Sequence, residues 1–380
     1  MAKKNDDKNK IVRENWMNNF TLIGRYAPHN TFIKIDEKSE NSNWQYSNMT
    51  LGVDCGEKCG IVTADMVGGF SLERENVIYA HGKNEDGSDD YSNQILVAWE
   101  DRFDENILES IGDRSFIVVG LEFTDKKKVF YKKFLSAYDA IPYIEQALDA
   151  LTDDAVIKVR GSLKYSLYND VTQVNKQITQ IYIDTKSKEE DFTAKFVQSI
   201  LVDSDSIDKN EIDKERGLVY INARVLDYVK EINGKDISGQ YPFSKVFEFY
   251  TDLNDKKKFA AIMSKLFKPK KNIRQVTFNG LFVEGGATVT TTYEDVPDDV
   301  KELVDIGVYT EEEAIAACST GGSRERHMVL TKPYIKNTDG TSIPQIFDDV
   351  YTEDDLSFNV DTDDSEEVSS EEFDEFLADL

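Results

Sequence analysis

The stretch KKFLSAYDAIPYIEQALDALTDD, residues 132–154, marks a change of pattern in the chain. Its apolar residues recur at steps of three and four, which predicts one amphipathic helix, irregular at Pro142. The next stretch, AVIKVRGSLKYSLY (155–168), alternates apolar and polar residues, and so does KQITQIYID (176–184) after a polar turn. Because a period of two is typical of half-buried strands, the local order is helix, strand, turn, strand.

Strands are also predicted on the N-terminal side of this helix. Three strands, a helix and two further strands form the element order of an OB-fold, a five-stranded barrel whose strand face and loops bind oligonucleotides. Other antiparallel barrels and sandwiches share this pattern. The alternating segments are FTLIGRY (20–26), TFIKI (31–35), NWQYSNMTLGV (43–53), VIYAHGK (77–83), QILVAWEDRF (94–103) and SFIVVGLEF (115–123).

The same order recurs in the second half of the chain. The sequence therefore predicts a mainly β protein with a few helices, built as two OB-fold-like barrels in tandem. Two short helical stretches and a last strand, HMVLTKPYIK (327–336), follow the second set. That set has strands at 192–202, 217–229 and 244–251, a helix at DKKKFAAIMSKLF (255–267), and a hairpin of IRQVTFNGLFV (273–283) with ATVTTTY (287–293).

The charge is distributed unevenly and indicates the domain boundaries. The chain has 45 Lys and Arg against 72 Asp and Glu, a net charge of −27. No Lys or Arg follows Lys336, and the last part of the chain holds 16 of the acidic residues, which leaves the remainder at −11. A run of one sign with few apolar residues favours disorder. We expect a polar arm at 1–18, barrels at 19–187 and 188–337, the second with a C-terminal helical extension, and a disordered acidic tail at 338–380.

The end of the tail carries a short pattern of its own. In SSEEFDEFLADL the apolar residues fall at i, i+3, i+4 and i+7, the spacing of an amphipathic helix. Such a short helix is not stable alone, so we expect it to fold in a hydrophobic groove of a partner protein. The alternative is a solubilising tail without a partner. The docking residues are Phe373, Phe376, Leu377 and Leu380.

Cations and aromatic residues occur together at a few places in the body. A groove for single-stranded DNA needs cations along the phosphate path and aromatic faces on which bases stack. The alternative is that the lysines are solvated and the aromatics belong to the core. The candidate DNA-binding residues are Lys126, Lys127, Lys128, Phe130, Tyr131, Lys132, Lys158, Arg160, Lys164, Tyr165, Tyr168, Lys256, Lys257, Lys268, Lys270, Lys271 and Arg274.

Other classes of protein find little support in the sequence. No apolar run reaches about 18 residues, and the basic start lacks an apolar stretch behind it, so we expect no membrane span and no secretory signal. No nucleotide-binding or hydrolase motif is present, which predicts a protein that is not an enzyme and has no cofactor. Cys55 and Cys59 have a metal-like spacing but would need Cys318 and His327 to complete a site, so we predict no metal.

The organisation as a whole resembles the single-stranded DNA-binding proteins of bacteriophages that infect Gram-positive bacteria. The segment DIGVYTEEEAIAACSTGGSRERHMVLTKPYIK (305–336) also resembles the end of the folded part of such proteins. The resemblance implies a protein that coats single-stranded DNA in the cytoplasm of the bacterial host. It also implies an acidic tail that competes with DNA and recruits replication or recombination proteins.

One feature departs from that family's pattern. Bacterial single-strand binders end in acidic residues followed by Pro-Phe, whereas this chain ends Leu377-Ala378-Asp379-Leu380. The main alternative function is an acidic virion or scaffold-type interaction protein without DNA affinity. The sequence does not predict the oligomeric state.

Overall fold

The structure is a computed structural model of all 380 residues. It describes residues 11–40, 42–152, 154–207, 212–232, 235–269, 273–284, 326–338 and 340–356, together with residues 301, 304, 310 and 311. The described part is mostly β with few helices, as predicted, and most of its strands belong to one 14-stranded sheet.

Five strands of the first half pair in a closed ring, which we call ring 1. Strand β1 pairs antiparallel with both β3 and β9, β3 pairs with β4, and β9 pairs with β10. The ring closes where β10 meets β4 in parallel, at Gln177 and Asp65. The members are β1 (Asn18–Tyr26), β3 (Trp44–Asp54), β4 (Ile61–Ser71), β9 (Val156–Tyr168) and β10 (Val171–Ile183).

Five strands of the second half repeat this ring, here called ring 2. Strand β11 pairs antiparallel with β12 and β14, β12 pairs with β13, and β14 pairs with β15. A parallel contact between β13 and β15 closes the ring, as the contact between β4 and β10 closes ring 1. The members are β11 (Thr193–Val202), β12 (Leu218–Ile232), β13 (Lys235–Tyr250), β14 (Ile273–Glu284) and β15 (Arg326–Pro333).

Each ring carries one helix between its third and fourth strands. Helix α2 (Ala137–Asp149) is capped by Ser136 and buries a face that includes Ile141 and Ile144 against β3, β4 and β7. Gly68 lets it approach β4, because a Cβ there would lie 2.6 Å from the backbone nitrogen of Tyr138. In ring 2 the helix is α3 (Lys256–Ile262), continued by a π-helical turn, Met263–Phe267.

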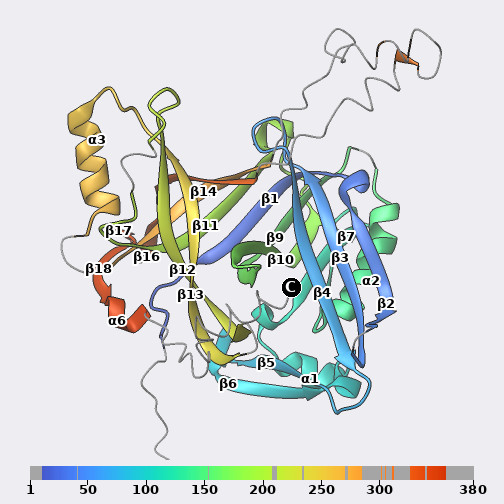
Figure 1. Ribbon diagram of the computed structural model, residues 1–380. Helices are drawn as coiled ribbons and strands as arrows, with labels where there is room; N and C mark the ends of the chain where they lie inside the picture. The colour runs from blue at the N-terminus through green and yellow to red at the C-terminus, as the bar shows by residue number, and fades with distance from the viewer. Residues whose placement is uncertain are drawn as a thin grey trace, which may run out of the picture.

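The two rings share one sheet and one core. Their first strands, β1 and β11, pair antiparallel from Asn18 opposite Gln198 to Ile23 opposite Thr193. Ring 1 lies on the right and ring 2 on the left in Figure 1. One cluster of buried side chains runs through both, from Leu22 and Val159 to Phe247 and Phe278. The predicted boundary at 187/188 falls between β10 and β11, but the halves are joined through β1 and β11.

Ring 1 carries an insertion that ring 2 lacks. Strands β7 and β8 extend the sheet beyond β10, while β5 and β6 form a separate two-stranded ribbon. Strand β2 pairs with the outer edge of β3. The bounds are β2 (Phe32–Lys38), β5 (Val77–Lys83), β6 (Asp89–Ala98), α1 (Glu105–Ser110), β7 (Ile117–Phe123) and β8 (Val129–Phe134), with 3₁₀ turns at Pro28–Asn30, Trp99–Asp101, Asp113–Ser115 and Glu189–Asp191.

Both ends of the described chain are more ordered than predicted. Ile11 packs with Leu201, Leu226, Tyr351 and Leu356 in a small second core, so part of the predicted arm and the first part of the predicted tail are folded. The predicted boundary at 338 is therefore wrong. The elements beyond it are β16 (Ile335–Thr338), β17 (Thr341–Pro344), β18 (Ile346–Tyr351), which pairs with β14, and α6 (Glu353–Leu356).

Two other predictions fall wholly or partly outside the described residues. The strand expected at 287–293 lies there, and β14 pairs instead with β15, a strand more than 40 residues further along the chain. The docking residues Phe373, Phe376, Leu377 and Leu380 also lie outside. Among the residues that the structure describes, no helix is long and apolar enough to cross a membrane.

Candidate nucleic-acid interface

The sheet that continues from ring 1 into ring 2 through the β1–β11 pair has one outward surface, which we call the shared face. It consists of the outward side chains of β8, β7, β10, β9, β1, β11, β14 and β15. Paired residues of neighbouring strands lie side by side on the same side of a sheet. The inward side chains of these strands, such as Leu22, Val159, Ile181 and Phe196, are buried.

The central row of this face crosses both rings. Arg160 of β9 lies opposite Thr21 of β1, and Thr21 lies opposite Lys195 of β11. Two strand spacings of about 4.8 Å place the two cationic residues about 10 Å apart. Both are exposed, and among the described residues no carboxylate lies within ion-pair distance of either. The full row is Val118, Gln180, Arg160, Thr21, Lys195, Leu281 and Val329.

The rows on either side of the central row also lack acidic residues. On the strands of the shared face none of the three rows contains an Asp or Glu, although the chain as a whole has a net charge of −27, and the nearest carboxylate in register is that of Asp65 on β4, beside Gln177. One flanking row is Gly120, Tyr182, Lys158, Ile23 and Thr193. The other is Gln177, Ser162, Asn19, Val197, Asn279 and Lys332.

Two tyrosines lie at the β8 end of the shared face. The rings of Tyr131 and Tyr182 are edge to face, with 6.0 Å between centroids, and the Arg160 guanidinium lies 6.0 Å from the Tyr182 ring. Gly120 makes room for them, since a Cβ there would come within 2.8 Å of the Tyr131 ring. Burial raises the pKa of Tyr182, so its phenol is uncharged at neutral pH. The arrangement offers aromatic surface beside a cation.

Two other lysines near this face are partly engaged. Lys158 lies 3.7 Å from the Asp184 carboxylate, and Lys133 of β8 lies 2.8 Å from that of Asp113. Burial alone would raise the pKa of Asp184, but hydrogen bonds from the backbone and from Ser187 together lower it, so this carboxylate is ionised. Arg160 and Lys195 are therefore the freer cations.

The structure brings only some of the predicted DNA-binding residues together. Tyr131, Lys158 and Arg160 meet on the shared face, and all lie on the outward side that alternation predicts. Lys126, Lys127 and Lys128 are exposed in the turn before β8, and Phe130 is exposed on that strand. Lys132 points toward α2, over the rings of Phe134 and Tyr143.

Two of the predicted contacts are wrong because the side chains are buried. Tyr165 is 4 % exposed, and its hydroxyl lies 3.0 Å from Oε1 of Gln198. Arg274 is 5 % exposed and donates to Asp348 and to two backbone carbonyls of the π-helical turn that follows α3. Neither side chain can reach a nucleic acid in this conformation.

The remaining predicted residues lie away from the shared face or outside the description. Lys164 is within 3.5 Å of Asp227 in ring 2, so it joins the rings. Tyr168 is 70 % exposed at the tip of the β9–β10 hairpin. Lys256, Lys257 and Lys268 are exposed on or beside α3, and Lys270 and Lys271 lie outside the described residues.

Sequence reasoning missed Tyr182 and Lys195, which complete the shared face. Tyr182 alternates with the buried Ile181 and Ile183, and Lys195 alternates with the buried Ala194 and Phe196. Alternation alone gives each an outward position. The sequence did not predict the pairing of β1 with β11, which places Lys195 on the same face as β9, across β1.

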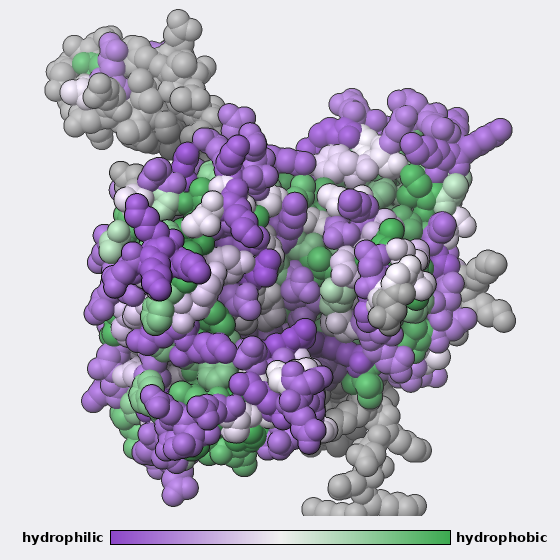
Figure 2. Space-filling model, turned by 180° about the vertical axis from the view of Figure 1, so that it is seen from behind, coloured by the Kyte–Doolittle hydropathy of each residue, from purple (hydrophilic) through white to green (hydrophobic). Residues whose placement is uncertain are grey.

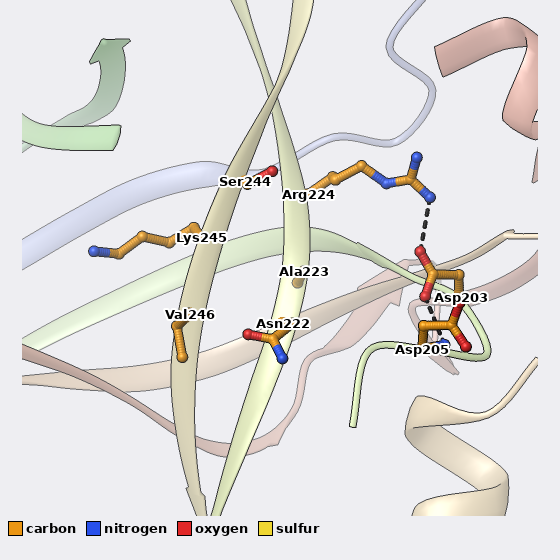
Figure 3. Close-up of a pocket in the computed structure, with 8 residues that line it drawn as sticks. All are labelled: Asp203, Asp205, Asn222, Ala223, Arg224, Ser244, Lys245 and Val246. Atoms are coloured by element: carbon orange, nitrogen blue, oxygen red, sulfur yellow. Dashed lines mark hydrogen bonds and ion pairs between the residues drawn. The ribbon is translucent and has the colours of Figure 1, made fainter. Parts of the chain in front are cut away.

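Ring 2 has an open pocket of about 400 Å³ beside β12 and β13. Figure 3 shows Arg224 pointing toward Asp203, with Lys245 on the other side of the strands. The Arg224 guanidinium also makes two bonds of 2.8 Å to Glu353 of α6. Burial, and then the charge of Lys176, lower the pKa of Lys245. Arg224 in this pocket is thus already matched by two carboxylates.

The described residues do not support a metal site. Cys55 and Cys59 are buried free thiols at the β3–β4 turn, and burial raises the pKa of Cys55, which disfavours the thiolate that a metal needs. His327 lies 2.5 Å from Glu248, and Cys318 lies outside the described residues. In the part of the chain that the structure describes, no three His, Cys, Asp or Glu side chains form a group able to hold an ion.

Seen from behind, the surface is hollowed between the two halves, and hydrophilic side chains cover much of both (Figure 2). Ring 1 lies on the left in this view and ring 2 on the right, because the molecule is turned by 180° from Figure 1.

Comparison with known proteins gives limited likeness. No protein-family model matches the chain, and no curated protein matches it. Among solved structures, the wild-type single-stranded DNA binding protein from Thermus aquaticus is 10% identical to this chain. The match covers 72% of this chain and 87% of that protein, with a TM-score of 0.31. A deletion mutant of that protein is 12% identical, and the match covers 71% of this chain and 88% of the mutant chain, with a TM-score of 0.29. Scores at this level do not establish a common fold.

Proposed function

We propose that this chain is a single-stranded DNA-binding protein, and that its two rings are OB-fold barrels. The strand pairing supports the barrels: each ring has the order first, second, third, fifth, fourth, with a helix between the third and fourth strands. Oligonucleotide binding is a common use of that barrel. Because the fold alone does not give a function, the proposal depends on the shared face.

The observation that carries the proposal is the row that joins Arg160 and Lys195 across both rings. In a chain this acidic, three neighbouring rows without a carboxylate form the surface best suited to a polyanion. Phosphates would bind the two cations, and bases would stack on Tyr131 and Tyr182. From β8 to β11 the face spans five strand spacings, about 24 Å, which accommodates several nucleotides.

The faces formed by the second and third strands fit DNA less well as they stand. Glu353 holds Arg224 of ring 2 in the way that a phosphate would. This contact supports competition between the acidic C-terminal segment and DNA, since removal of Glu353 would take away one of the two carboxylates that pair with Arg224. The rest of the tail, with Phe373, Phe376, Leu377 and Leu380, would then be available to replication or recombination proteins.

We place the protein in the cytoplasm of a bacterial host, where a phage genome is replicated. It acts by binding, without a catalytic step or a cofactor. The alternative, a virion or scaffold-type interaction protein without DNA affinity, is the outcome if the shared face fails the following test.

The test compares two charge-reversed variants. Arg160→Glu with Lys195→Glu changes the shared face, while Lys38→Glu with Lys214→Glu makes the same change in charge at exposed residues elsewhere. Anisotropy of a labelled oligothymidine at low salt should show binding weakened roughly tenfold or more by the first pair and much less by the second. Excess duplex should compete poorly. Equal effects of both pairs, or no preference for single strands, would reject the proposal.

A further inference from the structure

The outer side of the β5–β6 ribbon is apolar and uncovered by any described residue. Its inner side packs Ala80 and Val97 against Ile111 and Phe116. On the outer side, Tyr79 lies directly opposite Leu96, and the two are 67 % and 60 % exposed. Val77 beside them is also exposed. An apolar sheet face that is exposed on the surface of a protein indicates a contact with another protein.

The surroundings of this ribbon are strongly acidic. Residues 72–115 hold 12 Asp and Glu against 4 Lys and Arg, a net charge of −8. Of the 12, only Asp89 and Asp113 lie in ion pairs among the described residues. The charge repels nucleic acid, and it selects a partner whose contact surface is cationic.

Helix α3 has the complementary character. The π-helical turn that continues it packs on ring 2 through Met263, Leu266 and Phe267, and the lysines of the helix and the turn are exposed. Among the described residues, none of these lysines lies within ion-pair distance of a carboxylate. The exposed lysines of α3 and its continuation are Lys256, Lys257, Lys258, Lys265 and Lys268.

Lysine side chains suit an apolar acidic surface for two reasons. Their aliphatic stems cover apolar side chains such as Leu96 while the ammonium groups remain in contact with carboxylates. An ammonium group is also attracted to the face of an aromatic ring, and Tyr79 offers one. Figure 1 shows α3 at the outer side of ring 2, far from the ribbon at the lower edge, so the two surfaces of a single chain cannot meet.

We propose that the lysine side of α3 in one copy binds the acidic β5–β6 ribbon of a second copy. The contact joins two different surfaces, so each copy retains one free ribbon and one free helix. Such head-to-tail contacts extend into rings or open filaments. The interaction does not require DNA, so its test is independent of the proposed function.

Sedimentation velocity without DNA tests this contact with two variants. The helix variant carries Lys257→Glu, Lys258→Glu and Lys265→Glu, and the ribbon variant carries Glu73→Lys, Glu75→Lys and Glu100→Lys. The wild type should associate with rising concentration at low salt and dissociate at high salt. Each variant alone should remain monomeric. An equimolar mixture should associate, because the acidic helix of one then meets the basic ribbon of the other.

Tyr79→Ser with Leu96→Ser tests the apolar part of the contact. This pair leaves the charge unchanged and should weaken association, while the circular-dichroism melt confirms that the variant is folded. The proposal is overturned if the wild type stays monomeric at every concentration, if neither reversal affects its association, or if the mixed variants do not associate.

Discussion

At the scale of single residues, Asp227 shows how the two rings are held together. Its carboxylate is 1 % exposed and accepts bonds from Arg13 at 2.6 Å and from the backbone nitrogen of Tyr165 at 2.9 Å. Lys164 lies 3.5 Å away. The N-terminal segment, ring 1 and ring 2 thus meet at one buried carboxylate. A buried carboxylate is tolerated only when such partners satisfy it.

Replacement of Asp227 should therefore destabilise the protein strongly. Asp227→Ala leaves the half-buried Arg13 guanidinium and a buried backbone N–H without their acceptor, a loss on the order of 3–5 kcal/mol in the free energy of unfolding. Asp205→Ala, at an exposed position of ring 2, serves as the control and should change little. Urea titration measures both, and a loss below about 1 kcal/mol for Asp227→Ala would contradict the assigned role.

At the scale of elements, the sequence predicts the local pieces well and their partners poorly. Periodicity predicts the helix over 132–154, and α2 occupies Ala137–Asp149. It also predicts both strands of the next hairpin, although β10 begins at Val171 because Asn169 and Asp170 turn the chain with positive φ. The partner strand expected for β14 at 287–293 lies outside the described residues, and β14 pairs with β15, which follows a long intervening segment.

For the candidate site as well, the sequence predicts the local orientation of side chains but not their distant partners. Alternation in β9 places Lys158, Arg160 and Lys164 outward, as predicted, and the same alternation puts Tyr165, at the opposite parity, in the core. Alternation cannot show that the outward Lys164 faces another ring or that Arg274 is covered by β18. These outcomes depend on contacts between segments far apart in the chain, which local patterns do not contain.

The C-terminal element α6 should respond to pH through Glu353. Hydrogen bonding to Arg224, and then the charge of that residue, lower the pKa of Glu353. A carboxyl whose pKa is lower in the folded state contributes stability above its unfolded value, about 4.3, and loses that contribution as the pH falls through the folded value. Stability should therefore decline in acid partly through this pair.

Glu353→Gln removes that titration and keeps the shape of the side chain. The variant should be less stable than the wild type at pH 7, and the difference should shrink as the pH approaches 3. Urea titrations from pH 7 to 3 measure the difference, with Glu190→Gln at an exposed position as control. A difference that is constant with pH would contradict the role of the Glu353–Arg224 pair.

At the scale of the whole molecule, the strong negative charge and a DNA-binding role are compatible because the charge is segregated. Acids gather in the C-terminal segment and around the β5–β6 ribbon, whereas the rows through Arg160 and Lys195 contain none. The pairing of β1 with β11 makes one continuous surface out of the two rings. Two separate rings would present two short surfaces, and the shared sheet presents one long surface.

The salt dependence of binding tests the central claim, that phosphates bind Arg160 and Lys195 on the shared face. Each phosphate of a single strand that a cation no longer neutralises makes the slope of log K against log salt concentration shallower by about 0.7. Titrations of labelled oligothymidine over a range of salt should therefore give a slope shallower by about 1.4 for Arg160→Ala with Lys195→Ala than for the wild type. An unchanged slope and an unchanged affinity would contradict the account.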